Sequence, residues 1–336
     1  MSRVSEPSKR NSEYLDVACL VIAFLRADGV ERLLKAISLA GITRTYIAID
    51  GARTDSEREI QETLTVRAEE LATTLGIELI TWKRDSNLGL ATSVITGLNW
   101  FFSFEKYGII FEDDLDPHPD FFYFAKEALS IYDNCEDVWM ISGNCFNPKQ
   151  NTRNKASWAT YPLIWGWATW RQAWLEMESS LLRERELNFD GVPRNVKNFL
   201  SVGKERSLNG VIESWAVPLA ASMHAAKKLC LIPPVNLVGN LGDDSFAIHT
   251  KSIYQGGTKS VDFLPLCFEF SVKESIKESI KESMEMDSFI ESNIYMIRFR
   301  HSFLPLYRPI IDYFLRKKSK HKSPLSSRVA SVIVPQ

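Results

Sequence analysis

Short apolar runs alternate with longer helical patterns along the first third of the sequence, and this alternation constrains the fold more than any other feature. The apolar runs have the length of strands and little polar alternation, as strands buried on both faces do, and they lie at 17–24, 45–50, 77–82 and 107–112. Helical patterns separate them at 30–40, about 54–75 and 90–104, and Thr54 with Glu57 forms a capping box at the start of the second helix. Strands separated by helices of this length predict an α/β fold, in which helices cover both faces of a parallel sheet.

The rest of the sequence is irregular and rich in aromatic residues. We expect one further strand at 138–143 and a helix that begins near Trp215, with Pro218 in its first turn. The repeat KESIKESIKESM, residues 273–284, predicts a solvated surface helix with Lys and Glu on its exposed side. Its apolar residues share one stripe: Ile276, Ile280 and Met284. The chain then ends in a polar stretch that we expect to be mobile.

Composition argues against several classes of protein. Hydrophobic residues make up 45% of the chain and charged residues 24%, which argues against wholesale disorder, and a net charge of −2 does not suggest a nucleic-acid binder. The five cysteines are scattered without a CxxC pair, which favours reduced thiols over a disulfide framework or a zinc site. The N-terminus lacks the apolar centre of a signal peptide, and the run ACLVIAFL is too short to cross a bilayer. We therefore expect a cytoplasmic protein.

Polar residues follow three of the predicted strands, at the edge of the sheet where parallel strands bind ligands. Arg26 follows the first strand, and Asp50 ends the second. An acidic triplet ends the fourth: Glu112, Asp113 and Asp114. Clustered carboxylates repel one another unless they are solvated or hold a cation. Because the strand before the triplet is buried, we expect a divalent cation here, and carboxylates suit Mg²⁺ or Mn²⁺, which keep positions open for phosphate oxygens.

Several motifs stand in one order around this triplet: RDSNLGLATSVITGLNWFF before it, and PDFFYF, YPLIWGWATWRQAW and PPVNLVGNLGDDSFAIHT after it. Together with the triplet they resemble the bacterial glycosyltransferases of the GT-A fold, family-2-like proteins related to N-acetylglucosaminyltransferase I, over about residues 17–270. The resemblance implies a Rossmann-like, mostly parallel sheet with a helical C-terminal appendage. The expected divisions are an N-terminal tail (1–14), a glycosyltransferase domain (15–270) with a nucleotide-sugar half (15–134) and an acceptor half (135–270), and a helical, basic tail (271–336).

The resemblance also implies roles for residues at the first two strand ends. Arg26 matches an arginine that faces the donor nucleotide or its phosphates, with a simple strand-end cap as the alternative. Asp50, followed by Gly51, matches an acid expected to hydrogen-bond the base or ribose of the donor, although Asp-Gly alone is a turn signal. Asn87 and Gly89 fit a tight turn whose backbone approaches the donor.

The triplet and one histidine complete the expected donor site. Glu112, Asp113 and Asp114 match the Glu-Asp-Asp of the family, in which the last acid binds the metal that bridges the donor diphosphate. His249 matches a histidine near the diphosphate and the metal, and a structural histidine is the alternative.

Four tryptophans fall between residues 165 and 174. Trp170 and Trp174, at i,i+4 spacing, are expected to pack inward. Trp165 and Trp167 flank Gly166 in an expected loop, and we expect one of them to line the donor or acceptor pocket, because an indole face suits the C–H face of a sugar.

Glu213 matches the family's acid-x-Trp motif, in which a catalytic base is expected. It would lie at the N-terminus of the helix that begins near Trp215, where the helix dipole favours the ionised form. Two departures bear on this assignment. Pro218 puts the register in doubt, and Asp243 and Asp244 lie closer to the preceding glycine than expected, which makes them reserve candidates for the base.

The strand-end residues and the resemblance together predict a glycosyltransferase that uses Mn²⁺ or Mg²⁺ and transfers a sugar from a nucleoside diphosphate to a glycan or lipid-linked glycan. The resemblance alone favours UDP as the nucleotide. A sugar-phosphate nucleotidylyltransferase and a non-catalytic sugar-binding or scaffold protein are the alternatives; no glycine-rich phosphate loop follows the first strand. Residues 298–322 mix aromatic and basic side chains, which suggests peripheral attachment at the inner membrane as a hypothesis.

Overall fold

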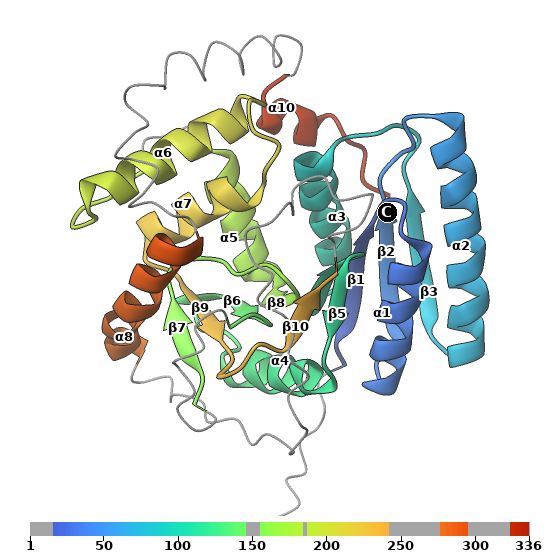
Figure 1. Ribbon diagram of the computed structural model, residues 1–336, viewed down its shortest axis with the longest axis horizontal. Coiled ribbons are helices and arrows are strands. Elements are labelled where there is room, and N and C mark those ends of the chain that lie inside the picture. The colour runs from blue at the N-terminus through green and yellow to red at the C-terminus, as the bar shows by residue number, and fades with distance from the viewer. Residues whose placement is uncertain (1–15, 146–154, 184–186, 242–275, 295–322, 336) are drawn as a thin grey trace, which may run out of the picture.

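The computed structural model of this chain describes residues 16–145, 155–183, 187–241, 276–294 and 323–335. Within these ranges eight strands form one sheet, and two short strands, β5 (Leu115–Pro117) and β10 (Val238–Asn240), form another (Figure 1). The large sheet has the order β3 (Glu78–Lys83), β2 (Arg44–Ile49), β1 (Ala18–Ala23), β4 (Tyr107–Glu112), β8 (Trp167–Trp170), β6 (Val138–Ser142), β9 (Leu229–Ile232) and β7 (Ser157–Ala159). Strands β8 and β7 run antiparallel to their neighbours and the others run parallel. The predicted α/β class with a mostly parallel sheet is confirmed.

The helices follow the strands on both sides of the sheet. They are α1 (Ala27–Leu39), α2 (Asp55–Leu75), α3 (Leu90–Phe104), α4 (Pro119–Ile131), α5 (Arg171–Leu182), α6 (Arg194–Leu208), α7 (Ala216–Ala226), α8 (Ile276–Phe289) with the π-helical turn η3 (Ile290–Ile294), and α10 (Leu325–Ala330). Helices α1 and α2 pack against each other, whereas α3 packs on β1 and β2 beside α5. Because parallel crossovers are right-handed, the reversal after β3 sends α3 to the opposite face from α1 and α2. None of the helices among the described residues is both long and apolar enough to cross a membrane.

Local sequence signals explain the first half of the fold. Every residue of β1 is buried, because this strand lies between β2 and β4 at the centre of the parallel part of the sheet. Thr54 caps α2 as predicted, its hydroxyl accepting a hydrogen bond from the Glu57 amide at 3.2 Å. Gly76 ends α2 in the left-handed conformation, with a φ of 68°. Pro218 lies in the first turn of α7, as expected.

The C-terminal elements differ from the sequence expectations. In α8 the Met284 side chain is 68% exposed, whereas Met286 and Asp287 are buried, and the helix packs on β7. The buried face of α8 is therefore not the stripe that includes Met284, and the helix is not merely a solvated surface element. The polar end of the chain, predicted to be mobile, forms α10 and packs on α3 and α6. Residues 298–322, the hypothetical membrane attachment, lie outside the described residues.

Candidate functional site

The strand order creates a switch point between β1 and β4. From β1 the chain moves outward to β2 and β3, and then returns to β4 on the other side of β1. In open parallel sheets, ligands bind at the carboxyl ends of the strands on either side of such a point. Arg26 follows β1 and the acidic triplet begins at the end of β4, so the two predicted groups meet at this position.

Asp113 joins the ends of the two strands. Its Oδ1 accepts a hydrogen bond from Arg26 Nη1 at 3.0 Å, and its Oδ2 accepts one from the Phe24 amide at 2.9 Å. The side chain is almost fully buried, and this burial raises the pKa of Asp113 while the Phe24 amide and Arg26 lower it. Helix α1 packs closely on the same segment, because a Cβ at Gly29 would lie 1.9 Å from the Asp113 carbonyl oxygen. Asp113 therefore holds the switch point together.

Asp114 presents an acceptor that the chain leaves unused. Its Oδ2 accepts a long hydrogen bond, 3.5 Å, from Asn240 Nδ2 at the end of β10. Its Oδ1 is buried and accepts no hydrogen bond from the part of the chain that the structure describes. Burial and then the charge of Asp113 raise the pKa of Asp114, and burial and the charges of Asp114 and Asp113 raise the pKa of Glu112 to about 8. Without a cation nearby, ionisation of these carboxylates is unfavourable.

The described residues do not complete a metal site by themselves, although Asp114 keeps a carboxylate oxygen without a partner among them. No group of three His, Cys, Asp or Glu side chains within the described ranges is arranged to hold a metal ion. Mg²⁺ and similar ions are commonly bound by one or two carboxylates together with substrate phosphates and water, which is what Asp114 and Glu112 offer. His249, predicted near this metal, lies outside the described residues, as do Asp243 and Asp244.

Asp50 anchors the loop that leads into α3. Its Oδ1 accepts hydrogen bonds from the amides of Gly51 and Leu88, at 3.0 and 2.9 Å. Its Oδ2 accepts them from Asn87 Nδ2 and the Gly89 amide, at 3.0 and 3.1 Å. Burial raises the pKa of Asp50, and the Leu88 amide is the first of several groups that lower it. The structure thus brings the four predicted residues Asp50, Gly51, Asn87 and Gly89 together, with the Asp50 carboxylate engaged inside the loop; a contact to the donor stays a prediction.

Glu213 reaches the same loop from the other half of the sequence. It lies between α6 and α7, and its Oε1 accepts a hydrogen bond from the Ala91 amide in the first turn of α3, at 3.4 Å. Gly89, with a φ of 78°, packs against this carboxylate so closely that a Cβ would lie 2.9 Å from Oε1. The group that approaches Gly89 is therefore Glu213.

The position of Glu213 corrects one expectation. It precedes α7 as predicted, but its carboxylate turns to the N-terminus of α3 and not to that of α7. Ser214 occupies the latter place, since its hydroxyl accepts a hydrogen bond from the Val217 amide at 3.3 Å. The dipole of α3 now provides the environment that favours an ionised carboxylate.

The tryptophans divide between core and surface. Trp167 is the first residue of β8, only 1% exposed, and its ring stacks on Trp215 with centroids 5.8 Å apart. Enclosed in this way, it offers no face to a sugar, which corrects the prediction for Trp167. Trp165 is partly exposed and precedes Gly166, whose φ of 63° turns the chain into β8, so its role stays a prediction. Two further tryptophans are buried as predicted: Trp170 and Trp174.

Sequence reasoning missed three residues of this region. Arg84 directly follows β3, and its guanidinium carbon lies 4.2 Å from the centroid of the Trp82 ring. It donates hydrogen bonds to Ser93 and Thr96, which fastens the first turns of α3. Burial lowers its pKa to about 10. The position of Arg84 directly before the DSNLG turn was a sequence signal that it could hold the start of α3. The other two, which contact Asp114 and Glu213 from distant parts of the chain, gave no local signal: Asn240 and Arg328.

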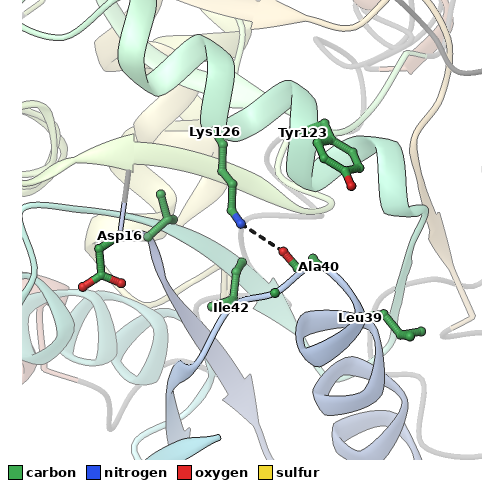
Figure 2. Close-up of a pocket in the computed structure, with 8 residues that line it drawn as sticks. Asp16, Leu39, Ala40, Ile42, Tyr123 and Lys126 are labelled. Atoms are coloured by element: carbon green, nitrogen blue, oxygen red, sulfur yellow. Dashed lines mark hydrogen bonds between the residues drawn. The ribbon is translucent and has the colours of Figure 1, made fainter. Parts of the chain in front are cut away.

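A hollow of about 480 Å³ lies at the other end of β1 from the switch point, where this strand begins (Figure 2). It is lined where β1 begins and α1 ends, by residues that include Asp16, Leu39 and Tyr123. The Lys126 side chain extends into the hollow, and its ammonium group donates a hydrogen bond to the Ala40 carbonyl at 3.0 Å (Figure 2). None of the predicted site residues lines it, so the hollow is separate from the switch point.

Comparisons with known proteins add little. No protein-family model matches this sequence, and a search of curated proteins finds no match. Among solved structures, a UDP-glucose pyrophosphorylase complexed with UDP-glucose is similar at 9% sequence identity and a TM-score of 0.36, covering 65% of this chain and 90% of that chain. A likeness at this level says nothing about the activity of this chain.

Proposed function

We propose that this chain is a metal-dependent glycosyltransferase of the GT-A fold, which moves a sugar from a nucleoside diphosphate, UDP by preference, to a hydroxyl group of a glycan or lipid-linked glycan. The observation that carries the proposal is the buried Oδ1 of Asp114 at the switch point, which has no partner among the described residues and lies beside the ion pair of Arg26 and Asp113. An acidic oxygen in this position favours a cation that binds together with the phosphates of a nucleotide.

Asp114 and Glu112 are the residues that would hold Mn²⁺ or Mg²⁺. Burial and mutual repulsion oppose their ionisation, so a divalent ion is the partner that best offsets their charge. The ion, when bound, supplies Lewis-acid stabilisation for the charge on the departing diphosphate. Arg26 keeps Asp113 in place and adds positive charge at the same strand ends.

Glu213 is the proposed general base of an inverting transfer. The acceptor oxygen bonds to the anomeric carbon, the bond from that carbon to the diphosphate oxygen breaks, and its electron pair leaves with the diphosphate. Glu213 takes the proton of the acceptor hydroxyl, and no covalent enzyme intermediate forms. Its place at the N-terminus of α3, against the loop that Asp50 anchors, supports this role. Asp243 and Asp244 are the reserve candidates.

A screen of nucleotide sugars tests the proposal without knowledge of the acceptor. Each sugar nucleotide is incubated with the protein and Mn²⁺, and products are separated with and without added pyrophosphate. We expect the protein to hydrolyse one of these sugar nucleotides slowly to free sugar and nucleoside diphosphate. The Asp114→Asn variant should lack this hydrolysis. Formation of nucleoside triphosphate and sugar 1-phosphate from added pyrophosphate would identify a nucleotidylyltransferase instead. Metal-dependent binding without turnover would favour the non-catalytic alternative, and absence of nucleotide binding would overturn the proposal.

A further inference from the structure

The C-terminal helix α10 reaches the region of the candidate site. It packs on α3 and α6, between which it is seen in Figure 1. Leu325 and Val329, one helical turn apart, are both buried and fix the helix to the domain. Arg328 lies three residues after Leu325 and next to Val329, so it shares the inward side of α10.

Arg328 meets the proposed base. Its Nη1 lies 3.4 Å from Glu213 Oε1, and the exposed fractions of the two side chains are 15% and 19%. The same oxygen accepts the hydrogen bond from the Ala91 amide. The Nε and Nη2 atoms of Arg328 are buried and make no hydrogen bond with any described residue. A guanidinium with two unpartnered nitrogens is costly to bury, and among the described residues Glu213 is the acid paired with its charge.

We propose that α10 completes the candidate site and that Arg328 is a positioning residue for the Glu213 carboxylate. This inference rests on the proposed function through the role given to Glu213. Two positive groups, the guanidinium and the N-terminus of α3, converge on Oε1 and fix the orientation of the carboxylate beside Gly89. A base held in this way accepts the acceptor proton from one defined direction, and misplacement by about 1 Å can cost about 100-fold in rate.

The test compares three arginine variants of the full-length chain. Arg328→Met keeps much of the length and removes the charge, whereas Arg328→Lys keeps the charge. Arg67→Met is the matched control, because Arg67 forms ion pairs with Asp28 and Glu31 on the surface of α1 and α2. Each variant is also made in a Glu213→Gln background. Circular dichroism and thermal unfolding verify the fold, and three readouts follow: nucleotide affinity with Mn²⁺, kcat for nucleotide-sugar hydrolysis, and hydrogen exchange of the α3 N-terminal amides.

We expect Arg328→Met to lower kcat by about 10- to 100-fold with nucleotide affinity within about twofold of wild type. Arg328→Lys should recover most of the loss, and Arg67→Met should cause none. In the Glu213→Gln background Arg328→Met should cost nothing further, since the group that it positions has lost its function. Wild-type kcat in Arg328→Met, or an equal loss in both backgrounds, would overturn the inference.

Failure of the proposed function gives a different pattern. The wild-type chain would then free no sugar from any nucleotide sugar, whether or not it binds one, and hydrogen exchange alone decides whether Arg328 positions Glu213. Faster exchange of the Ala91 amide in Arg328→Met, restored in Arg328→Lys, supports the positioning contact. Unchanged exchange in a folded Arg328→Met variant would overturn it whatever the activity of the chain. If Arg328→Met does not fold, Arg328→Gln, which also removes the charge, provides the same comparison in the two Glu213 backgrounds.

Discussion

Arg26 and Asp113 form an ion pair of 3.0 Å that joins the carboxyl ends of β1 and β4. The Phe24 amide donates to the same carboxylate, so Asp113 is satisfied within the chain, whereas its neighbour Asp114 keeps a buried oxygen without a partner among the described residues. Adjacent acids in one motif thus have different tasks. Asp113 builds the switch point, and Asp114 is the acid available to a ligand.

This difference predicts that the same substitution has different effects on stability at two adjacent positions. Asp113→Asn removes the charge from a buried hydrogen-bonded pair and should lower the free energy of unfolding by about 1–3 kcal/mol. Asp114→Asn relieves repulsion between neighbouring carboxylates and should leave stability unchanged or raise it. Urea unfolding of both variants at one pH measures the two effects. Equal destabilisation by both would mean that the acids are not divided in this way.

The metal prediction depends on Asp114. Mn²⁺ should tighten the binding of UDP to the wild-type chain, because a cation beside Asp114 and Glu112 offsets their charge and contacts the diphosphate. Asp114→Asn should abolish this enhancement while the fold stays intact. Calorimetric titration of UDP with Mn²⁺ and with a chelator measures it, and Asp116→Asn, an exposed acid two residues away, is the control. Equal affinity of the wild-type chain in both buffers would exclude the metal site.

The amino-acid pattern was sufficient to predict the framework of this site, and the reason is geometric. Apolar runs with helices between them specify a parallel sheet, and such a sheet brings the ends of its strands to one edge. Arg26, Asp50 and the triplet could therefore be grouped from their positions after the predicted strands. Thr54 and Glu57 fixed the start of α2 because capping is a local interaction.

The contacts that give these residues different roles join segments that are far apart in the sequence. Whether Asp113 or Asp114 faces Arg26 depends on side-chain directions at two separate strand ends. Glu213 was expected at the helix that follows it, but it contacts Ala91, 122 residues away in the chain. Arg328 contacts Glu213 across 115 residues, from a polar segment in which Leu325 and Val329 are the buried anchors. Two buried residues among polar neighbours are too weak a pattern to predict α10.

The loop that Asp50 anchors should depend on its charge. Asp50→Asn replaces one of two oxygens that each accept two hydrogen bonds, so one pair of donors would face an amide N–H₂. We expect a loss of about 2–3 kcal/mol in the free energy of unfolding, together with weaker nucleotide binding, because hydrogen bonds to a charged acceptor are worth about 1.5–3 kcal/mol. Asp85→Asn, at an exposed acid of the same segment, is the control. Full stability in Asp50→Asn would show that the carboxylate does not hold the loop.

Glu213→Gln should separate catalysis from donor binding. The variant keeps the shape of the side chain and removes its ability to accept a proton, so transfer or hydrolysis should fall by about 10²- to 10⁴-fold. UDP affinity with Mn²⁺ should stay near wild type. Glu205→Gln, an exposed position on α6, is the matched control. A wild-type rate in Glu213→Gln would reject the base assignment, and the Asp243 and Asp244 variants should then be measured.

The attachment of α8 should depend on pH through Asp287. Its Oδ1 accepts a hydrogen bond from the Thr160 amide at 2.8 Å, and its Oδ2 lies 2.8 Å from the Thr160 hydroxyl, which is also 2.6 Å from His224 Nδ1. Burial raises the pKa of Asp287 to about 7, and burial lowers the pKa of His224 to about 4. The charged or titratable groups around Asp287 also include Glu291 on η3 and Cys230 on β9.

The raised pKa of Asp287 fixes the sign of the effect. Between pH 4 and pH 7 the unfolded chain has released this proton while the folded chain still binds it, so the contribution of Asp287 to the free energy of unfolding falls as pH rises, by up to about 1.4 kcal/mol per pH unit. The lowered pKa of His224 acts in the opposite direction below about pH 6.5, and it is common to wild type and variant. Asp287→Asn resembles the protonated side chain and should remove this dependence. The difference in stability between the variant and wild type should therefore grow in favour of the variant from pH 5 to pH 7 and level off above it. Urea midpoints at each pH measure the difference, with Glu285→Gln, an exposed acid of α8, as the control. Parallel curves for wild type and Asp287→Asn would show that Asp287 is ionised throughout this range.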